Sequence, residues 1–281
     1  MTAVPPVSVV VPTYNSGPFV AATMDSILRQ TFVDFELVVT DHASTDDTWD
    51  VVSDFTSDPR VRLLRTEAGG GAARNWNRAT EEAQGELLKL VCADDLVYPT
   101  CLQEQVEALR AHPGATVAAC RRDLVDARGD VLLSNRGLPG LEGEVPGPEA
   151  IRRTVRAGGN IFGEPACVLL RTSVVRDVGG WSATDPYLID VDMYVRSLAS
   201  GSLVALPQTL AAFRVSAEQW SVALVREQAR QTVSFNKRVA ALNPGVLTTA
   251  DVRLGRARAY ASALQRRAAY LVWSRRMGMQ P

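Results

Sequence analysis

The sequence has few residues of the types that form zinc sites or disulfide frameworks. Only four of the 281 residues are cysteine and two are histidine, and no two cysteines are spaced as CxxC. This excludes a structural zinc site of the usual spacing and gives no basis for a disulfide scaffold. A reducing compartment suits such a chain, and we expect a cytoplasmic protein.

The sequence also lacks an excess of one charge and any long apolar run. It has 30 Lys plus Arg against 31 Asp plus Glu, for a formal net charge of −1. No overall field therefore attracts nucleic acid, and any anion must be held by a local site. No run of 18 apolar residues occurs, and the start MTAVPPVSVVVPTYN lacks the basic and apolar regions of a signal peptide. We expect neither secretion nor a membrane span.

Short apolar runs alternate with helix-periodic segments through the first 120 residues. The strand-like runs are 7–11, 35–40, 61–65, 86–91 and 116–120. Helical patterns lie between them, at 18–30, from about 44, after the glycines 69–71, and at 99–111. This alternation predicts an α/β fold with a mostly parallel central sheet flanked by helices.

Polar clusters follow the predicted strands. They are PTYN (12–15), Asp41, GGGAARN (69–75) and ADD (93–95). Ligands of such sheets bind outside the carboxyl ends of the strands, so we expect the four clusters to converge on one rim. The adjacent carboxylates Asp94 and Asp95 repel each other, and either a solvated turn or a bound cation would offset that cost.

The pattern is less regular after residue 121. The Gly/Pro-rich segment 135–149 predicts a long surface loop that acts as a lid or a connector. Residues 222–281 are predicted to be helical and carry arginines throughout. An amphipathic tail packed on its own domain is favoured, while peripheral membrane contact and a homodimer through these helices remain open.

Several reaction classes lack their motifs. Arg74 stands where the last glycine of G-x-G-x-x-G would be, and neither G-x-x-x-x-G-K-[ST] nor G-x-S-x-G occurs. A carboxylate pair near an arginine and glycine N–H groups instead suits a metal-bound diphosphate. Asp190 or Asp192 could be a base that takes a proton, although acidic residues at a helix start also simply favour the helix dipole.

Six strings occur in the order and approximate spacing of glycosyltransferase family 2. They are VSVVVPTYN, TDHASTDDT, AARNWNRATEEAQGE, CADD, VGGW and IDVDMYVRSLASG. The chain resembles that family over about residues 7–221. The resemblance implies a GT-A fold, inversion at the anomeric carbon, and Mn²⁺ or Mg²⁺. It also implies a nucleoside-diphosphate sugar donor, with a UDP-sugar favoured, and a hydroxyl-bearing acceptor such as a sugar, a lipid-linked glycan or a small natural product.

The resemblance divides the chain into three parts. Residues 1–120 would be the nucleotide-sugar-binding half, 121–221 the half with the acceptor site and catalytic base, and 222–281 a C-terminal helical extension.

The resemblance also assigns roles to the metal-binding, catalytic and donor-binding residues. Asp94 and Asp95 would bind the metal, with one of them, Asp94, also touching the donor. Asp190 would be the catalytic base, with Asp192 and Arg196 orienting its helix. The donor-binding residues would be Pro12, Thr13, Tyr14 and Asn15 on the pocket floor, Asp41 at the base, and Arg74 and Arg214 near the phosphates.

Asn160, Glu164 and Trp181 would line the acceptor pocket, because aromatic faces suit sugar rings and polar tips suit hydroxyls. For Trp181, a role as a core or hairpin anchor is an equal alternative.

The chain departs from the family pattern at Cys92, His42, Ile189 and Ser216. These positions put metal and donor binding in question. A catalytically inactive GT-A-like binding protein is therefore an alternative. A sugar nucleotidyltransferase is another, although PTYNSG lacks the basic residue that such an enzyme needs after its first strand.

Overall fold

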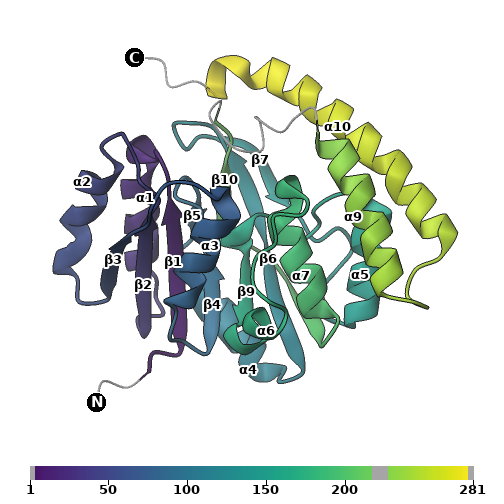
Figure 1. Ribbon diagram of the computed structural model, residues 1–281, viewed down its shortest axis with the longest axis horizontal. Helices are drawn as coiled ribbons and strands as arrows, with labels where there is room; N and C mark the ends of the chain where they lie inside the picture. Colours follow the sequence, from purple (N-terminus) through teal and green to yellow (C-terminus); the bar gives the residue numbers. More distant parts are fainter. Residues whose placement is uncertain (1–3, 217–226, 278–281) are drawn as a thin grey trace.

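The computed structural model describes residues 4–216 and 227–277, which form one curved sheet with helices on both faces (Figure 1). The strand order is β3-β2-β1-β4-β9-β6-β10-β5, with β7 paired to β6 and β8 paired to β10. The strands are β1 (Val7–Thr13), β2 (Phe35–Asp41), β3 (Val61–Arg65), β4 (Leu87–Leu90), β5 (Leu96–Val97), β6 (Ala115–Val125), β7 (Val131–Arg136), β8 (Gly143–Val145), β9 (Val168–Arg171) and β10 (Ser202–Arg214).

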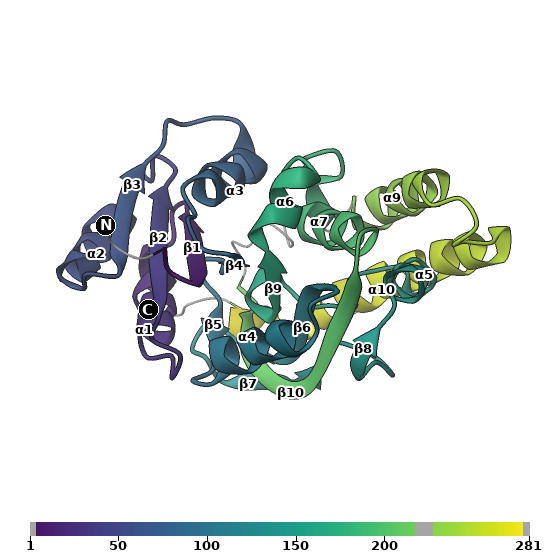
Figure 2. The same cartoon turned by 90° about the horizontal axis from the view of Figure 1, so that it is seen from below.

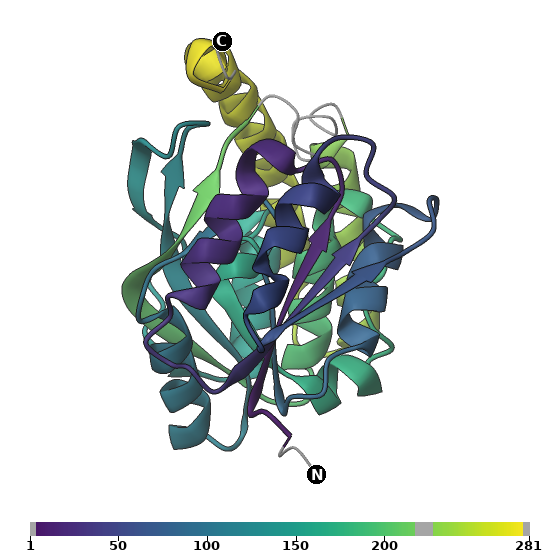
Figure 3. The ribbon, with the colours of Figure 1, turned by 90° about the vertical axis from the view of Figure 1, so that its left-hand side faces the viewer.

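The first half of the sheet has the predicted parallel order. Strands β3, β2, β1 and β4 are all parallel neighbours, and every residue of β1 is buried. The helices of this half are α1 (Gly17–Leu28), α2 (Thr48–Ser53), α3 (Gly71–Glu81) and α4 (Cys101–Ala111). Helices α1 and α3 lie on opposite faces of the strands (Figures 2 and 3). The α/β fold class is confirmed.

The second half mixes strand directions. Strand β9 is antiparallel to both β4 and β6, whereas β10 is parallel to β6. Strands β5, β7 and β8 pair antiparallel with their neighbours. The apolar run ACVLL (166–170), which contains most of β9, is typical of a strand but carries no signal of the direction of that strand. The mixed order therefore cannot be predicted from the local pattern.

The segment 135–149 is more ordered than a plain loop. It contains the end of β7, the short strand β8 and the first turn of α5 (Gly147–Ala157). Leu138 and Leu141 are buried, so this connection is fixed to the core.

The remaining helices cover the second half of the sheet. They are α6 (Thr172–Asp177), α7 (Ile189–Leu198), α9 (Gln228–Leu242) and α10 (Thr249–Met277), with short 3-10 turns at η2 (Pro165–Cys167) and η3 (Pro186–Leu188); a further 3-10 turn, η1 (Asp54–Ser57), follows α2 in the first half. The predicted helical tail is present from residue 227 to 277, while 222–226 and 278–281 lie outside the described residues. Within those described ranges, no helix combines the length and apolar character needed to cross a bilayer.

Two glycines let α10 approach α5 closely. Gly158 ends α5 with φ of 66°, and a Cβ there would lie 2.4 Å from the Gly255 carbonyl oxygen. A Cβ on Gly255 would lie 2.0 Å from the Val155 carbonyl oxygen. The backbones therefore touch, and Ala259, one turn later on α10, is fully buried. This contact fixes the tail against the second half of the sheet.

We predict that Gly255→Ala lowers the free energy of unfolding by about 1–3 kcal/mol, because the new methyl group overpacks a backbone contact. Urea titration followed by circular dichroism measures the change. Gly159→Ala is the control, since a Cβ at Gly159 meets no atom within 4 Å. Equal midpoints for the two variants would contradict the close approach.

Candidate active site

The carboxyl ends of β1 and β2 meet through a buried hydrogen-bond network. The Thr13 hydroxyl donates to Asp41 Oδ1 at 3.2 Å, and the Ser44 hydroxyl donates to the same oxygen at 2.5 Å. Asn75, from the glycine-rich string, donates from its side-chain amide to the Thr13 carbonyl at 3.1 Å. Pro12 is buried in β1 beside them. Three of the polar clusters therefore converge, as their positions after the strands predict.

Tyr14 and Asn15 form the outer part of this floor. Tyr14 is 61% exposed, so its ring is available to a ligand. Asn15 has φ of 46°, and its side-chain oxygen accepts a hydrogen bond from the Thr45 N–H at 2.9 Å. Asp41 is only 1% exposed and already accepts hydrogen bonds from Thr13 and Ser44. A contact between Asp41 and a nucleobase therefore remains a proposal.

The glycine loop is tied to the same rim. Nε2 of His42 lies 2.8 Å from the Gly69 carbonyl oxygen, which gives this departure from the family pattern a structural role. Gly70 has φ of 79°, and a Cβ there would lie 2.4 Å from Cδ of Arg74. The Arg74 guanidinium donates to the Ala68 and Gly69 carbonyls, each at 3.3 Å, and its side chain is half exposed. Such a group can turn toward an incoming phosphate.

Asp95 is a buried carboxylate with one oxygen unsatisfied. Its Oδ1 accepts a hydrogen bond from the Arg214 backbone N–H at 3.1 Å, whereas Oδ2 is buried without a partner among the described residues. Burial raises the pKa of Asp95 well above its usual value, and the nearby charges of Asp94 and Glu164 raise it further. A buried, unpaired carboxylate oxygen is costly, so this atom is a natural ligand for a cation.

The site fits a cation that shares its ligands with a substrate. Asp94, next to Asp95, is half-buried at the end of the β4 loop. No cluster of three or more His, Cys, Asp or Glu residues suited to a metal occurs in residues 4–216 and 227–277. The two aspartates would therefore leave most coordination positions to water and phosphate oxygens, as magnesium sites often do.

Cys92 stands where the family often has an acidic residue. Burial raises the pKa of its thiol well above the usual value, and the charges of Asp95 and Asp94 add to this. The thiol therefore stays protonated and does not replace a carboxylate.

Arg214 holds the carboxylate loop in place. It is 4% exposed, and its guanidinium donates to the carbonyls of Asp94 at 2.9 Å and Ala127 at 2.9 Å. The guanidinium carbon lies 5.0 Å from the centre of the Phe19 ring. In this structure Arg214 joins the loop after β4 to the turn after β6, and Ser216, two residues later, is also buried. The contact of Arg214 with donor phosphates stays a prediction.

Asp190 begins α7 and is held at both oxygens. Its Oδ1 accepts from the Val191 N–H at 2.8 Å, and its Oδ2 accepts from the Asn160 side-chain amide at 2.9 Å. Burial raises the pKa of Asp190 to about 7; the Val191 N–H opposes this rise and the charge of Glu164 adds to it. A carboxylate with a pKa near neutrality suits general-base catalysis.

Asn160 and Glu164, predicted to contact the acceptor, also support Asp190. The Asn160 side-chain oxygen accepts from the N–H groups of Phe162 at 2.9 Å and Gly163 at 3.1 Å, which fixes its amide toward Asp190. Glu164 forms an ion pair with Arg122 of β6. Arg122 was missed at the level of the sequence, because it stands in the charged run RRD (121–123) of β6 and nothing in that run indicates its partner.

Trp181 lies in the core. It is 4% exposed, its indole Nε1 donates to the Thr80 hydroxyl at 2.8 Å, and its ring packs edge-on against Trp76 with centroids 5.2 Å apart. Asn77 of α3 bonds both backbone groups of Trp181. This is the anchor that we considered as the alternative to an acceptor-binding role.

Asp192 and Arg196 fix the orientation of α7. Asp192 pairs with Arg196 at 2.7 Å and with Arg238 of α9 at 2.7 Å. The Arg196 guanidinium also donates to the carbonyls of Val178 at 2.6 Å and Gly180 at 2.8 Å. Ile189, before Asp190, is buried and packs in the core. The helix that carries Asp190 is therefore held on both sides.

Comparison with known proteins identifies the family to which the chain belongs. The model of glycosyl transferase family 2 matches residues 8–179, more than half of the chain. The chain belongs to this family.

Relatives of known sequence include an uncharacterized protein of Mycobacterium tuberculosis, 31% identical over 223 residues that cover 76% of this chain and 69% of that protein. The Escherichia coli enzyme WfgD, a UDP-Glc:α-D-GlcNAc-diphosphoundecaprenol β-1,3-glucosyltransferase, is 35% identical over 103 residues, which cover 37% of this chain and 40% of WfgD.

Two solved structures share the fold. S. aureus TarS 1–349 in complex with UDP-GlcNAc aligns with a TM-score of 0.66 at 21% identity, over 88% of this chain and 69% of that one. The mannosyltransferase PcManGT from Pyrobaculum calidifontis, in complex with GDP-Man and Mn²⁺, aligns with a TM-score of 0.61 at 21% identity, over 100% of this chain and 78% of that one.

We predict that the stability of the protein falls as pH rises toward the pKa of Asp190. The folded-state pKa of about 7 exceeds the ordinary value of 3.8, so between these values the folded state binds more protons than the unfolded state. The free energy of unfolding of Asp190→Asn minus that of the wild type should therefore be more positive at pH 8 than at pH 5. Urea midpoints at the two pH values measure this, and Asp50→Asn, at an exposed position, is the control. A pH-independent difference for Asp190→Asn would contradict the raised pKa.

Proposed function

We propose that the protein is an inverting, metal-dependent glycosyltransferase that moves a sugar from a nucleoside-diphosphate sugar, favouring a UDP-sugar, to an acceptor hydroxyl. The observation that carries this proposal is that the site contains two carboxylates whose environments suit them to different tasks. Asp95 has an unpartnered buried oxygen suited to a cation, and Asp190 has a pKa of about 7 suited to a base. Family membership supports transferase activity, and the UDP-GlcNAc complex of TarS supports the choice of nucleotide.

On the donor side, the nucleoside binds on a floor formed by Pro12, Thr13, Tyr14 and Asn15. Asp41 accepts a hydrogen bond from the nucleobase. Asp94 and Asp95 would hold Mn²⁺ or Mg²⁺, and the cation would neutralise charge on the diphosphate. Arg74 turns from the loop carbonyls to the phosphate oxygens, where its planar fork matches their spacing. The leaving group is then stabilised by charges that are in place before the reaction.

On the acceptor side, Asp190 removes the proton from the attacking hydroxyl. The new C–O bond forms on the face opposite the diphosphate as the old C–O bond breaks, so the anomeric carbon inverts. The Asn160 amide and the Val191 N–H fix both oxygens of Asp190, so the base keeps one orientation. Burial disfavours the ionised form of Asp190, and the negative charge of Glu164 disfavours it further, so the pKa of Asp190 stays high.

The acceptor would bind beside Asn160 and Glu164, which lie next to the base. Trp181 would act indirectly, because it anchors the turn before α7 on α3. WfgD transfers glucose to a GlcNAc-diphospholipid, which supports a lipid-linked glycan as one acceptor class.

We predict that one nucleotide class raises the melting temperature and that removing the metal abolishes most of the rise. A ligand at 100 times its Kd adds about 2.7 kcal/mol of stability. The measurement is a thermal-shift panel of UDP, GDP, CMP and dTDP, each with Mn²⁺, Mg²⁺ or EDTA. Asp95→Asn should lose the metal-dependent part of the shift, while Asp50→Asn should keep it. No shift with any nucleotide would favour an inactive relative.

We predict that Asp190→Asn lowers turnover by about 10²–10⁴-fold, the usual contribution of general-base catalysis, without loss of donor binding. Release of the nucleoside diphosphate, with the donor class fixed by the thermal-shift panel, gives the rate. In the wild type, kcat/KM should rise with pH to a plateau above about pH 7, because only the ionised Asp190 accepts the proton. Full activity in Asp190→Asn would show that another group is the base.

A further inference from the structure

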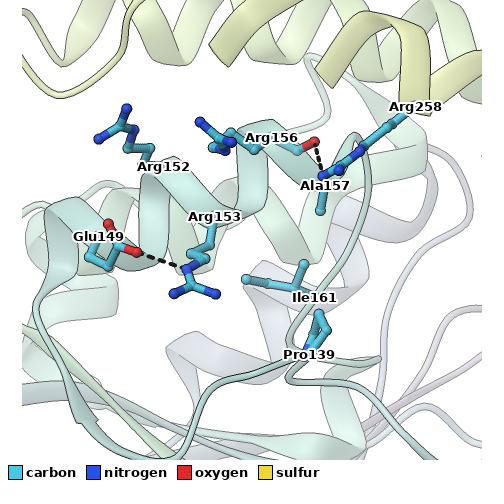
Figure 4. Close-up of a pocket in the computed structure, with 8 residues that line it drawn as sticks. All are labelled: Pro139, Glu149, Arg152, Arg153, Arg156, Ala157, Ile161 and Arg258. Carbon is cyan, nitrogen blue, oxygen red and sulfur yellow. Dashed lines mark hydrogen bonds and ion pairs between the residues drawn. The ribbon is translucent and has the colours of Figure 1, made fainter. Parts of the chain in front are cut away.

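A cavity lies away from the donor rim, between α5, α10 and the loops next to them. It has a volume of about 500 Å³. Its walls are Pro139, Glu149, Arg152, Arg153, Arg156, Ala157, Ile161 and Arg258 (Figure 4). Four of the eight residues are arginines, although the chain as a whole carries a net charge of −1. The cavity therefore has a local excess of basic side chains.

The helices place these arginines together. Arg152 and Arg156 are one turn apart on α5, and Arg153 lies beside them on the cavity side (Figure 4). Arg258 comes from α10, and its guanidinium donates to the Arg156 carbonyl at 3.2 Å. The close approach of Gly158 to Gly255 sets the distance between the two helices. The cavity is thus built by the same contact that fixes the tail.

The arginines carry more positive charge than their partners neutralise. Arg152 and Arg156 share a single carboxylate, the buried Asp251, at 3.1 and 2.6 Å. Arg153 pairs with the half-exposed Glu149 at 2.7 Å. In the described part of the chain, four guanidinium groups therefore face two carboxylates. An anion would be attracted here, and guanidinium forks match phosphate oxygens in geometry.

One loop separates this cavity from the proposed base. Ala157 and Ile161 line the cavity, and Asn160, between them in sequence, donates to Asp190 at 2.9 Å. The Ile161 carbonyl accepts from the Leu138 N–H at 2.7 Å, which closes the loop against the segment that carries Pro139. A ligand bound to the arginines would therefore lie next to the segment that holds Asn160. Helices α5 and α10 lie at the opposite side of the protein from β1, β2 and β3 (Figure 1).

We propose that this cavity binds the phosphate or diphosphate group of the acceptor. The inference rests on the proposed function, because it names the class of acceptor that the base at Asp190 would serve. A volume of about 500 Å³ exceeds the need of a single carboxylate and suits a diphosphate with part of the group attached to it. Ile161, Pro139 and Ala157 give that attached group an apolar wall.

The test uses inorganic pyrophosphate as the probe, titrated into the full-length protein by calorimetry at low salt with EDTA present. The informative variant is Arg153→Gln/Arg258→Gln, since these two arginines do not hold the buried Asp251. The control is Arg253→Gln/Arg256→Gln, which removes the same charge from exposed positions of α10 outside this cavity. The first pair should weaken binding by about tenfold to a hundredfold, as expected for lost charged hydrogen bonds, and the control should not.

Three results would overturn the proposal: no binding of pyrophosphate to the wild type, equal loss in both double variants, or tighter binding of glucuronate than of pyrophosphate. Farnesyl diphosphate separates the sources of the phosphate. Tighter binding than pyrophosphate indicates a lipid-linked acceptor, and equal binding indicates a soluble sugar phosphate. Nucleotide-induced thermal shifts should be the same in Arg153→Gln/Arg258→Gln as in the wild type. If the wild type shows no nucleotide-induced shift, the proposed function fails, whatever the result for pyrophosphate in this cavity.

Discussion

The site depends on keeping several carboxylates close together at a poorly hydrated rim. Burial raises the pKa of both Asp95 and Asp190; the charges of Asp94 and Glu164 raise that of Asp95 further, and the charge of Glu164 raises that of Asp190. Glu164 forms an ion pair with Arg122 of β6. The surrounding structure offsets the cost with backbone N–H groups at Asp95 and Asp190, and with Arg214, which fixes the loop through its carbonyls. A cation bound here would offset this cost, which supports the proposed metal site.

The two key aspartates differ because their environments differ. Asp190 has a hydrogen-bond donor on each oxygen and keeps some contact with solvent, so its proton can leave near neutral pH. Asp95 is almost fully enclosed and has an oxygen without a donor, so it is suited to hold a cation rather than to exchange a proton. Under the proposed function, two carboxylates with the same intrinsic chemistry would take different roles, as in other acid–base sites.

The sequence predicts what depends on local pattern and misses what depends on partners distant in the chain. The strand ends, and with them Thr13, Asp41 and Asp95, follow from apolar runs that stop at polar residues. The antiparallel direction of β9 has no local signal, and neither does the Arg122–Glu164 pair, whose members are 42 residues apart. Trp181 shows the same limit. An aromatic residue after two glycines fits a ligand face or a core anchor equally well, and only its contacts with Thr80 and Asn77 show that it is buried as an anchor.

Residues 157–164 lie between Asp190 and the arginine cavity, so they connect the cavity to the proposed base. Its inner side carries Asn160, which orients Asp190, and its outer side carries Ala157 and Ile161, which line the arginine cavity. An occupant of the cavity would restrict the same segment that holds Asn160, and the more rigid segment would keep Asp190 in the orientation that proton transfer needs. Gly158, within this loop, is also in backbone contact with α10. The tail helix therefore helps to hold the segment that positions Asp190. Acceptor recognition and positioning of the base would then depend on one set of contacts, between α5, α10 and the loop that joins them to the site.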